Sequence, residues 1–124
     1  MNLVDSSCWI EYLTGSAIGA AVADAVEDTD LLVVPSICLY EVYRKLAGEK
    51  SEAYAAEVVS YMQNGRVVAL DAALGVFAAK VSREYRLSVA DSIIYATAIQ
   101  NAATLWTSDR HFQDIRGVRY LEKV

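Results

Sequence analysis

The segment Asp30-Leu31-Leu32-Val33-Val34-Pro35 places four consecutive apolar residues between an aspartate and the only proline of the chain. An uninterrupted apolar run of this length is typical of a strand that is covered on both faces, as the strands of parallel sheets are. The segment therefore predicts a parallel sheet with helices packed on both of its sides.

On both sides of this segment, short apolar runs alternate with longer helical patterns. We expect strands at residues 3–4, 31–34, 67–70, 104–106 and 118–121, and helices at 8–13, 17–27, 36–47, 53–62, 72–85 and 88–100. Predicted helix N-caps are Ser6 or Ser7, Ser36 and Asp71. Alternation of this kind implies parallel pairing through right-handed crossovers, so the expected fold is α/β with a mostly parallel central sheet of about five strands.

The composition fits one domain that spans residues 1–124, because 55% of the residues are hydrophobic and no linker-like stretch interrupts them. Cys8 and Cys38 lie among apolar neighbours, which predicts two reduced, buried thiols. The chain starts without a basic and apolar leader, and its longest uncharged stretch, residues 92–108, contains several polar side chains. We therefore expect a soluble cytoplasmic protein with no membrane contact.

Acidic residues stand where parallel strands end and the following helices begin. Asp5 and Asp109 directly follow or closely follow predicted strands, Glu41 lies near the start of a helix, and Asp91 lies in the first turn of another. Active sites of such sheets lie beyond the carboxyl ends of the strands. Four carboxylates brought together there would repel one another unless a divalent cation such as Mg²⁺ or Mn²⁺ lay between them.

Three of these acids also have a purely structural interpretation. Asp5 and Asp109 are suited to cap the helix or turn that follows each of them. Asp91 completes an S-x-x-D pattern with Ser88, which is a capping signal that needs no catalysis. Taken singly, each of the three is as readily a cap as a ligand.

Glu41 is harder to explain as a structural residue. An ion pair with Arg44 or Lys45, three and four residues further along the helix, is its ordinary interpretation. However, the helix around it is mostly apolar, and a charge in such a place needs a partner or a metal.

Four strings of the sequence carry a family resemblance: LVDSS at residues 3–7, YEVYR at 40–44, LSVADSIIYATA at 87–98 and WTSDRHF at 106–112. In order and spacing they resemble the PIN-domain ribonucleases of the VapC toxin type, over essentially the whole chain. The resemblance implies a three-layer α/β/α fold. It also implies a catalytic acidic quartet with Mg²⁺ or Mn²⁺ as cofactor, made of Asp5, Glu41, Asp91 and Asp109. Two accessory hydroxyl groups around the metal site would be those of Ser6 and Thr107.

The resemblance implies a metal-dependent endoribonuclease that hydrolyses RNA phosphodiester bonds as the toxin of a toxin–antitoxin pair. In our hypothesis Asp5 and Asp109 bind the main metal ion, and Asp91 helps to hold it or a second ion. Glu41 orients or deprotonates the attacking water. The implied partners are the RNA substrate, a small antitoxin protein and a second copy of the chain in a homodimer.

The net charge of −5 is unfavourable for a protein that binds RNA through a broad basic face. Arg44 and Arg110, next to the acidic positions, are the candidate RNA contacts. His111, the only histidine, cannot form a zinc site alone, and we expect it to have a structural or peripheral role.

Two other functions fit parts of the pattern. An aspartyl-phosphate phosphatase would use Asp5 as its nucleophile, but Ser7 stands where a second acid is usual. A non-catalytic PIN-like scaffold or protein-binding module would keep the fold without binding metal.

Overall fold

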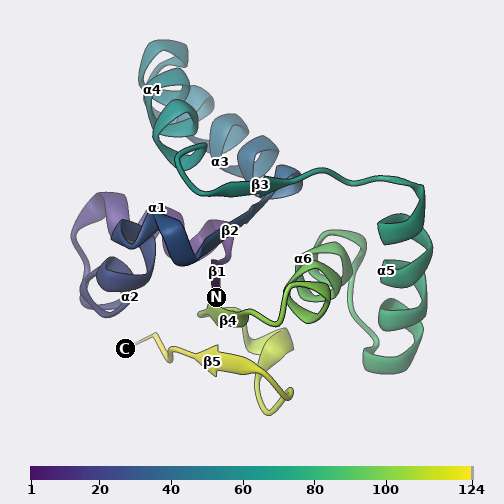
Figure 1. Ribbon diagram of the computed structural model, residues 1–124. Coiled ribbons are helices and arrows are strands. Elements are labelled where there is room, and N and C mark those ends of the chain that lie inside the picture. Colours follow the sequence, from purple (N-terminus) through teal and green to yellow (C-terminus); the bar gives the residue numbers. More distant parts are fainter. Residues whose placement is uncertain (124) are drawn as a thin grey trace.

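The computed structural model describes residues 1–123 of the chain (Figure 1). Its strands are β1 (Asn2–Val4), β2 (Leu32–Pro35), β3 (Arg66–Val68), β4 (Thr104–Thr107) and β5 (Val118–Tyr120). Its α-helices are α1 (Ser6–Thr14), α2 (Ala17–Glu27), α3 (Ser36–Glu49), α4 (Glu52–Met62), α5 (Ala72–Tyr85) and α6 (Val89–Gln100). Two short 3₁₀ turns are η1 (Thr29–Leu31) and η2 (Arg110–Phe112).

The five strands form one sheet in the order β3-β2-β1-β4-β5, and every neighbouring pair is parallel. Helices α1 to α4 lie on one side of the sheet, and α5 and α6 lie on the other (Figure 1). The predicted α/β architecture with three layers and a parallel sheet is confirmed.

The strand order changes direction at the centre of the sheet. From β1 the chain steps outward to β2 and β3, and it then crosses back to β4 on the other side of β1. In sheets of this kind the crevice for ligands lies at the carboxyl ends of the two strands at this switch point. Here these strands are β1 and β4, which precede Asp5 and Asp109.

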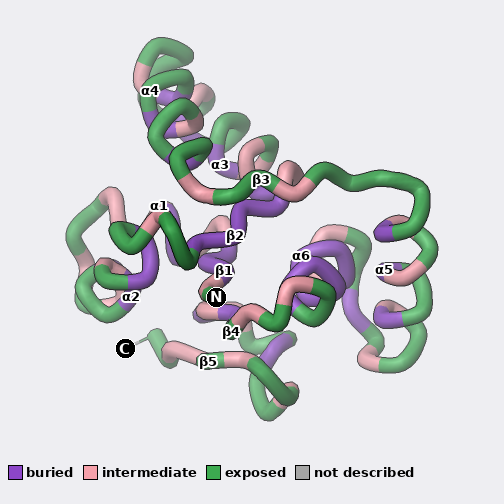
Figure 2. The backbone as a smooth tube through the Cα atoms, in the orientation of Figure 1, coloured by how far each residue is buried: buried purple, intermediate pink, exposed green. Residues whose placement is uncertain are grey.

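The middle strands are buried on both faces, as the apolar run at residues 31–34 predicted. All four residues of β2 are buried, and Leu3, Val4 and Leu105 have no exposed surface (Figure 2). Helix α6 is buried over seven consecutive residues from Ser92 to Ala98, because it lies between the sheet and α5. This packing fixes the first turn of α6, which carries Asp91, against the end of the sheet.

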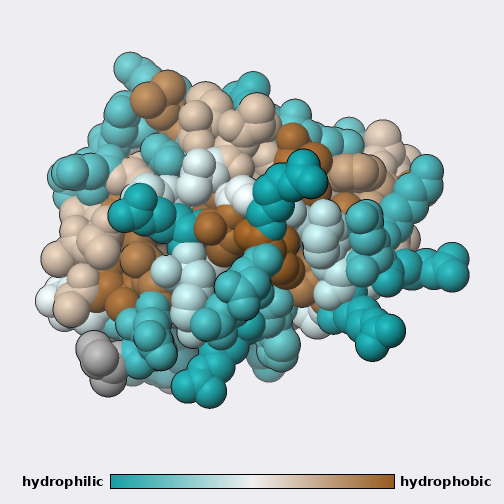
Figure 3. Space-filling view, turned by 90° about the horizontal axis from the view of Figure 1, so that it is seen from below, coloured by the Kyte–Doolittle hydropathy of each residue, from teal (hydrophilic) through white to brown (hydrophobic). Residues whose placement is uncertain are grey.

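The edge of the sheet at β5 is more polar. Val118 and Tyr120 are half-buried and Arg119 between them is exposed, with its guanidinium 5.0 Å from the ring centre of Trp106. On this face, hydrophilic side chains surround an apolar centre (Figure 3). Across residues 1–123, no helix has the length and apolar character that a membrane crossing requires.

Several predicted boundaries were wrong. The third strand is β3 and not residues 67–70, because its register against β2 pairs Val33 with Arg66 and ends at Pro35 and Val68. Leu31 belongs to η1 and is exposed.

Ser36 is the first residue of α3 and not its N-cap, which is Pro35. The Ser36 hydroxyl instead accepts a hydrogen bond from the backbone N–H of Leu70 (3.3 Å). The predicted cap of α5, Asp71, is confirmed and accepts from the N–H of Leu74 at 2.8 Å.

Candidate metal centre

The ends of β1 and β4 are joined by a buried hydroxyl group. Thr107, which has no exposed surface, donates from Oγ1 to Oδ2 of Asp5 and accepts from the backbone N–H of Asp109 at 3.0 Å. The backbone N–H of Asp5 also donates to the carbonyl of Trp106 at 3.0 Å. Asp5 and Asp109 are therefore held side by side through Thr107.

The Asp5 carboxylate is also the N-cap of α1. Its Oδ1 accepts from the backbone N–H and the hydroxyl of Ser7, at 2.7 and 2.6 Å, so neither Ser6 nor Ser7 is the cap that the sequence predicted. Ser7 Oγ in turn lies 3.4 Å from Oγ of Ser108. The structural and the functional interpretations of Asp5 are thus compatible, since the cap holds a nearly buried carboxylate at the switch point.

Asp91, in the first turn of α6, and Asp109, just after β4, approach one another, and the His111 side chain contacts both. One ligand atom from each of the three residues can be chosen such that all lie within 4.8 Å of one another. His111 Nδ1 is 2.9 Å from Oδ1 of Asp109 and 3.6 Å from Oδ2 of Asp91. The sequence did not predict this contact, because a lone histidine in an exposed turn gives no signal of its own.

The capping interpretation is confirmed for Asp109, whereas at the start of α6 the capping side chain is that of Ser88 and not that of Asp91. The backbone N–H of Asp91 donates to the hydroxyl of Ser88 at 3.4 Å, and Asp109 Oδ1 accepts from the backbone N–H of His111 at 2.9 Å. Both acids therefore stand at the start of a helical turn, with part of each carboxylate still available to a ligand.

The acids repel one another electrostatically. Partial burial, followed by the charge of Asp109, raises the pKa of Asp91 from its ordinary value of 3.8 to about 6, and the charge of Asp5 adds to the effect. A bound divalent cation relieves such repulsion. The two carboxylates and one imidazole that Asp91, Asp109 and His111 bring together are also oxygen and nitrogen donors that suit such an ion. The donor set therefore fits Mg²⁺ or Mn²⁺.

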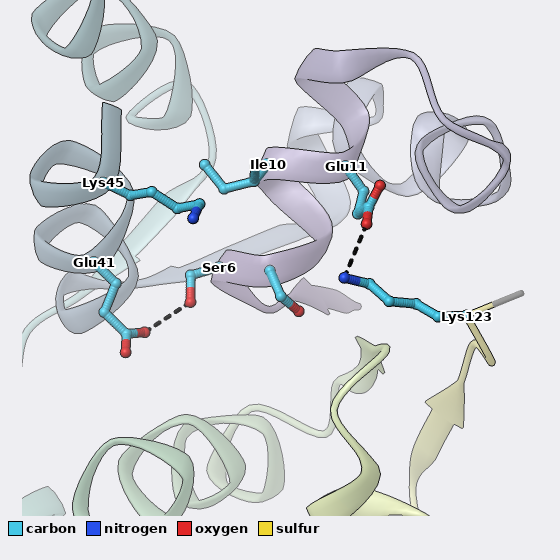
Figure 4. A pocket seen from close by; sticks show the side chains of 7 residues that line it. Ser6, Ile10, Glu11, Glu41, Lys45 and Lys123 are labelled. Atoms are coloured by element: carbon cyan, nitrogen blue, oxygen red, sulfur yellow. Dashed lines mark hydrogen bonds and ion pairs between the residues drawn. The ribbon is translucent and has the colours of Figure 1, made fainter. Parts of the chain in front are cut away.

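Glu41 reaches the site from α3 and makes a different contact. Its Oε1 accepts a hydrogen bond of 2.8 Å from the hydroxyl of Ser6, which directly follows Asp5 (Figure 4). Within residues 1–123, neither of the alternative partners of Glu41, Arg44 and Lys45, forms an ion pair with it, and Lys45 Nζ pairs with Glu49 at 2.9 Å. Glu41 is thus joined to the site through Ser6, and neither Glu41 nor Asp5 belongs to the group formed by Asp91, Asp109 and His111.

A hollow of about 350 Å³ opens beside Glu41. The ammonium groups of Lys45 and Lys123 lie at this hollow, and Lys123 pairs with Glu11 at 3.2 Å (Figure 4). It is lined by Ser6, Ser7, Ile10, Glu11, Glu41, Lys45 and Lys123. The acidic site therefore has two cationic groups on its Glu41 side.

The thiols of the two cysteines near the acids have raised pKa values. Burial, together with the charge of Asp5, raises the pKa of Cys8 to about 12, and burial, with the charges of Asp5 and Glu41, raises the pKa of Cys38 well above its ordinary value. Both are free and buried, as predicted. A protonated thiol is a poor metal ligand, so the two cysteines do not belong to the donor set of this site.

Comparison with solved structures gives matches over nearly the whole chain. A toxin–antitoxin complex from Klebsiella pneumoniae contains a chain that matches with a TM-score of 0.82 and 21% identity, covering 99% of this chain and 100% of that one. VapBC2 from Rickettsia felis, bound to a DNA fragment from its promoter, matches with a TM-score of 0.72 and 13% identity, covering 98% and 97%.

The toxin VapC20 from Mycobacterium tuberculosis, described as cleaving the sarcin–ricin loop, matches with a TM-score of 0.69 and 17% identity, covering 88% and 92%. At these identities the matches establish a common fold. A search of curated protein sequences finds no match.

The sequence itself matches the family model described as PIN domain over residues 3–118. This range includes the four acids, the two accessory hydroxyls and the strands that carry them. The chain belongs to the PIN-domain family.

Proposed function

We propose that this protein is a divalent-metal-dependent endoribonuclease and the toxin of a toxin–antitoxin pair. The observation that carries the proposal is the meeting of Asp91 and Asp109 beside Asp5 at the switch point of a PIN-domain sheet. Support for the toxin role comes from the similar solved structures, which include toxin–antitoxin complexes.

In this proposal Asp5, Asp91 and Asp109 hold Mg²⁺ or Mn²⁺. When bound, such an ion supplies an activated water and neutralises the charge that develops on the phosphate. Thr107 keeps the carboxylate of Asp5 in place, because its hydroxyl bonds both that carboxylate and the backbone of Asp109.

Glu41 is proposed to orient the attacking water or to accept its proton. Among the described residues its carboxylate accepts one side-chain hydrogen bond, at Oε1 from Ser6, which leaves Oε2 to face a water molecule. Ser6 would therefore act as an accessory residue that sets the orientation of Glu41. This arrangement separates the proton acceptor from the metal ligands.

RNA would approach across exposed cations on both sides of the acids. Arg110 follows Asp109 in η2, and Arg44 and Lys45 follow Glu41 on α3, all with exposed side chains. Together with bound metal ions, these groups would offset the net charge of −5 near the phosphate chain. Because its substrate is RNA, we place the protein in the cytoplasm.

The proposed protein partners are a small antitoxin and a second copy of the chain. A hollow of about 360 Å³ between α1, α3 and α4, lined by Ile10, Leu13, Leu46 and Tyr54 among others, suits an amphipathic segment of the antitoxin. Exposed apolar side chains at Leu70, Val76 and Val89 suit a homodimer contact.

The test is cleavage of transfer and ribosomal RNA by the purified chain with Mg²⁺ or Mn²⁺, compared with a chelator and with Asp5→Asn. We expect cleavage that needs both the metal and Asp5, with a loss of at least about a hundredfold in the variant.

Asp71→Asn is the matched control, since Asp71 is also an aspartate N-cap, but on α5 and away from the acids. It should cleave RNA like the unmodified chain. If the purified chain binds neither Mg²⁺ nor Mn²⁺, the nuclease proposal is refuted and a scaffold function is favoured.

A further inference from the structure

His111 stands in direct contact with two of the proposed metal ligands and has no role in the mechanism above. We propose that His111 is itself a ligand of the metal centre through Nδ1, and that it makes the centre prefer Mn²⁺ to Mg²⁺. The inference rests on the proposed function and deepens it, because it concerns which ion the same site takes.

The distances fit one coordination sphere. An octahedral ion with ligands at about 2.1 Å places neighbouring ligand atoms about 3 Å apart and opposite ones about 4 Å apart. His111 Nδ1 lies 2.9 Å from Asp109 Oδ1 and 3.6 Å from Asp91 Oδ2, and all three ligand atoms lie within 4.8 Å of one another. Little movement is needed for all three residues to bind the same ion.

The turn that carries His111 is fixed at both ends. Asp109 Oδ1 accepts from the backbone N–H of His111 at 2.9 Å, and the next residue, Phe112, is fully buried against the ring of Tyr95. Although the His111 side chain is 75% exposed, its backbone is therefore held beside the acids. An exposed imidazole also loses little hydration when it moves onto an ion.

The imidazole would change the choice of metal because Mg²⁺ and Mn²⁺ differ in the donors they accept. Mg²⁺ binds oxygen almost exclusively and keeps several of its waters, so a nitrogen donor adds little to its affinity. First-row transition ions bind mixed nitrogen and oxygen sites more tightly, and Mn²⁺ is the hardest of that series. One nitrogen among carboxylates should therefore raise the affinity for Mn²⁺ more than the affinity for Mg²⁺.

The chain offers a direct spectroscopic test, because His111 is its only histidine. In the protein loaded with Mn²⁺, pulsed electron paramagnetic resonance should detect coupling between the ion and an imidazole nitrogen. Labelling of histidine with ¹⁵N should change this coupling, and His111→Gln should remove it. Bound Mn²⁺ without nitrogen coupling would overturn the inference while leaving the metal site of the proposed function intact.

Calorimetric titration with each ion gives an independent measurement. His111→Gln should weaken Mn²⁺ binding at least about tenfold and change Mg²⁺ binding less than about twofold. Asp114 is an exposed residue two positions after the 3₁₀ turn η2 that carries His111, with φ of 65° that asparagine also adopts. Asp114→Asn is therefore the control, since it removes a charge from the same loop and should leave the ratio of the two affinities unchanged. Equal losses for both ions in His111→Gln would overturn the inference, and binding of neither ion by the unmodified chain would overturn the proposed function as well.

Discussion

The hydroxyl of Thr107 donates a hydrogen bond to the carboxylate of Asp5, across 102 positions of sequence. The same oxygen accepts from the backbone N–H of Asp109. One buried side chain thus fixes the relative position of two strand ends and of two proposed metal ligands.

Replacing Thr107 by valine keeps the shape of the side chain and removes both hydrogen bonds. We expect the free energy of unfolding to fall by about 2 kcal/mol, because a buried carboxylate oxygen and a backbone N–H lose their partner. RNA cleavage should fall at least about tenfold, since Oδ2 of Asp5 loses the hydrogen bond that orients it. Thr107→Ser keeps the hydroxyl and should retain most of the activity. Urea unfolding measures the loss of stability, and a cleavage assay measures the loss of activity. Equal losses in the two variants would contradict the role of the hydroxyl.

Glu41→Gln should separate catalysis from metal binding. Cleavage should fall by about a hundredfold or more, because the amide cannot accept a proton. Mn²⁺ affinity, measured by calorimetry, should change far less than in Asp109→Asn, because Asp109 lies together with Asp91 and His111, whereas the Glu41 carboxylate is bonded to Ser6. A loss of Mn²⁺ affinity as large as that of Asp109→Asn would make Glu41 a metal ligand instead.

The raised pKa of Asp91 predicts how stability depends on pH. Because the pKa is about 6 in the folded protein and near 3.8 in the unfolded chain, the folded protein binds more protons between these values. The free energy of unfolding of the metal-free protein should therefore fall as the pH rises from about 4 to 6.

Asp91→Asn should flatten this dependence and leave the metal-free protein more stable than the unmodified chain at pH 7. Urea unfolding in the presence of a chelator measures both effects. The affinity for Mn²⁺ should change with pH in the opposite direction to the stability. Mn²⁺ needs the ionised carboxylate, so it should bind more tightly at pH 7 than at pH 5. An unchanged pH profile in Asp91→Asn would show that another group titrates.

Two helical glycines, one in a close helix contact and one beside open space, allow a matched test of helix packing. A Cβ at Gly19 in α2 would clash with the carbonyl oxygen of Glu11 and lie 2.8 Å from Cα of Tyr12, so Gly19→Ala should destabilise the fold by about 3 kcal/mol. Gly75→Ala in α5 meets no atom of the described residues within 4 Å, and it should stabilise the fold by up to about 1 kcal/mol. Thermal unfolding compares the two, and similar effects would contradict the close approach of α1 and α2.

The placement of strands and helices was largely predictable from sequence, because their patterns are local. The apolar run that became β2 and the capping role of Asp71 depend on residues close together in the chain. The errors arose where a distant segment decides the result. The end of β3 is set by its pairing with Pro35 in β2, and Ser36 bonds Leu70 instead of capping its own helix.

The sequence by itself determined the α/β class, the family and the positions of Asp5, Glu41, Asp91 and Asp109 at strand ends and helix starts. Only the tertiary structure decided how these acids are grouped. It places Asp91 and Asp109 beside His111, binds Asp5 to Thr107, and leaves Glu41 with Ser6 on the other side. The physical reason is that carboxylate contacts depend on the packing of α6 and α3 against the sheet, whereas strand and helix patterns depend on neighbouring residues.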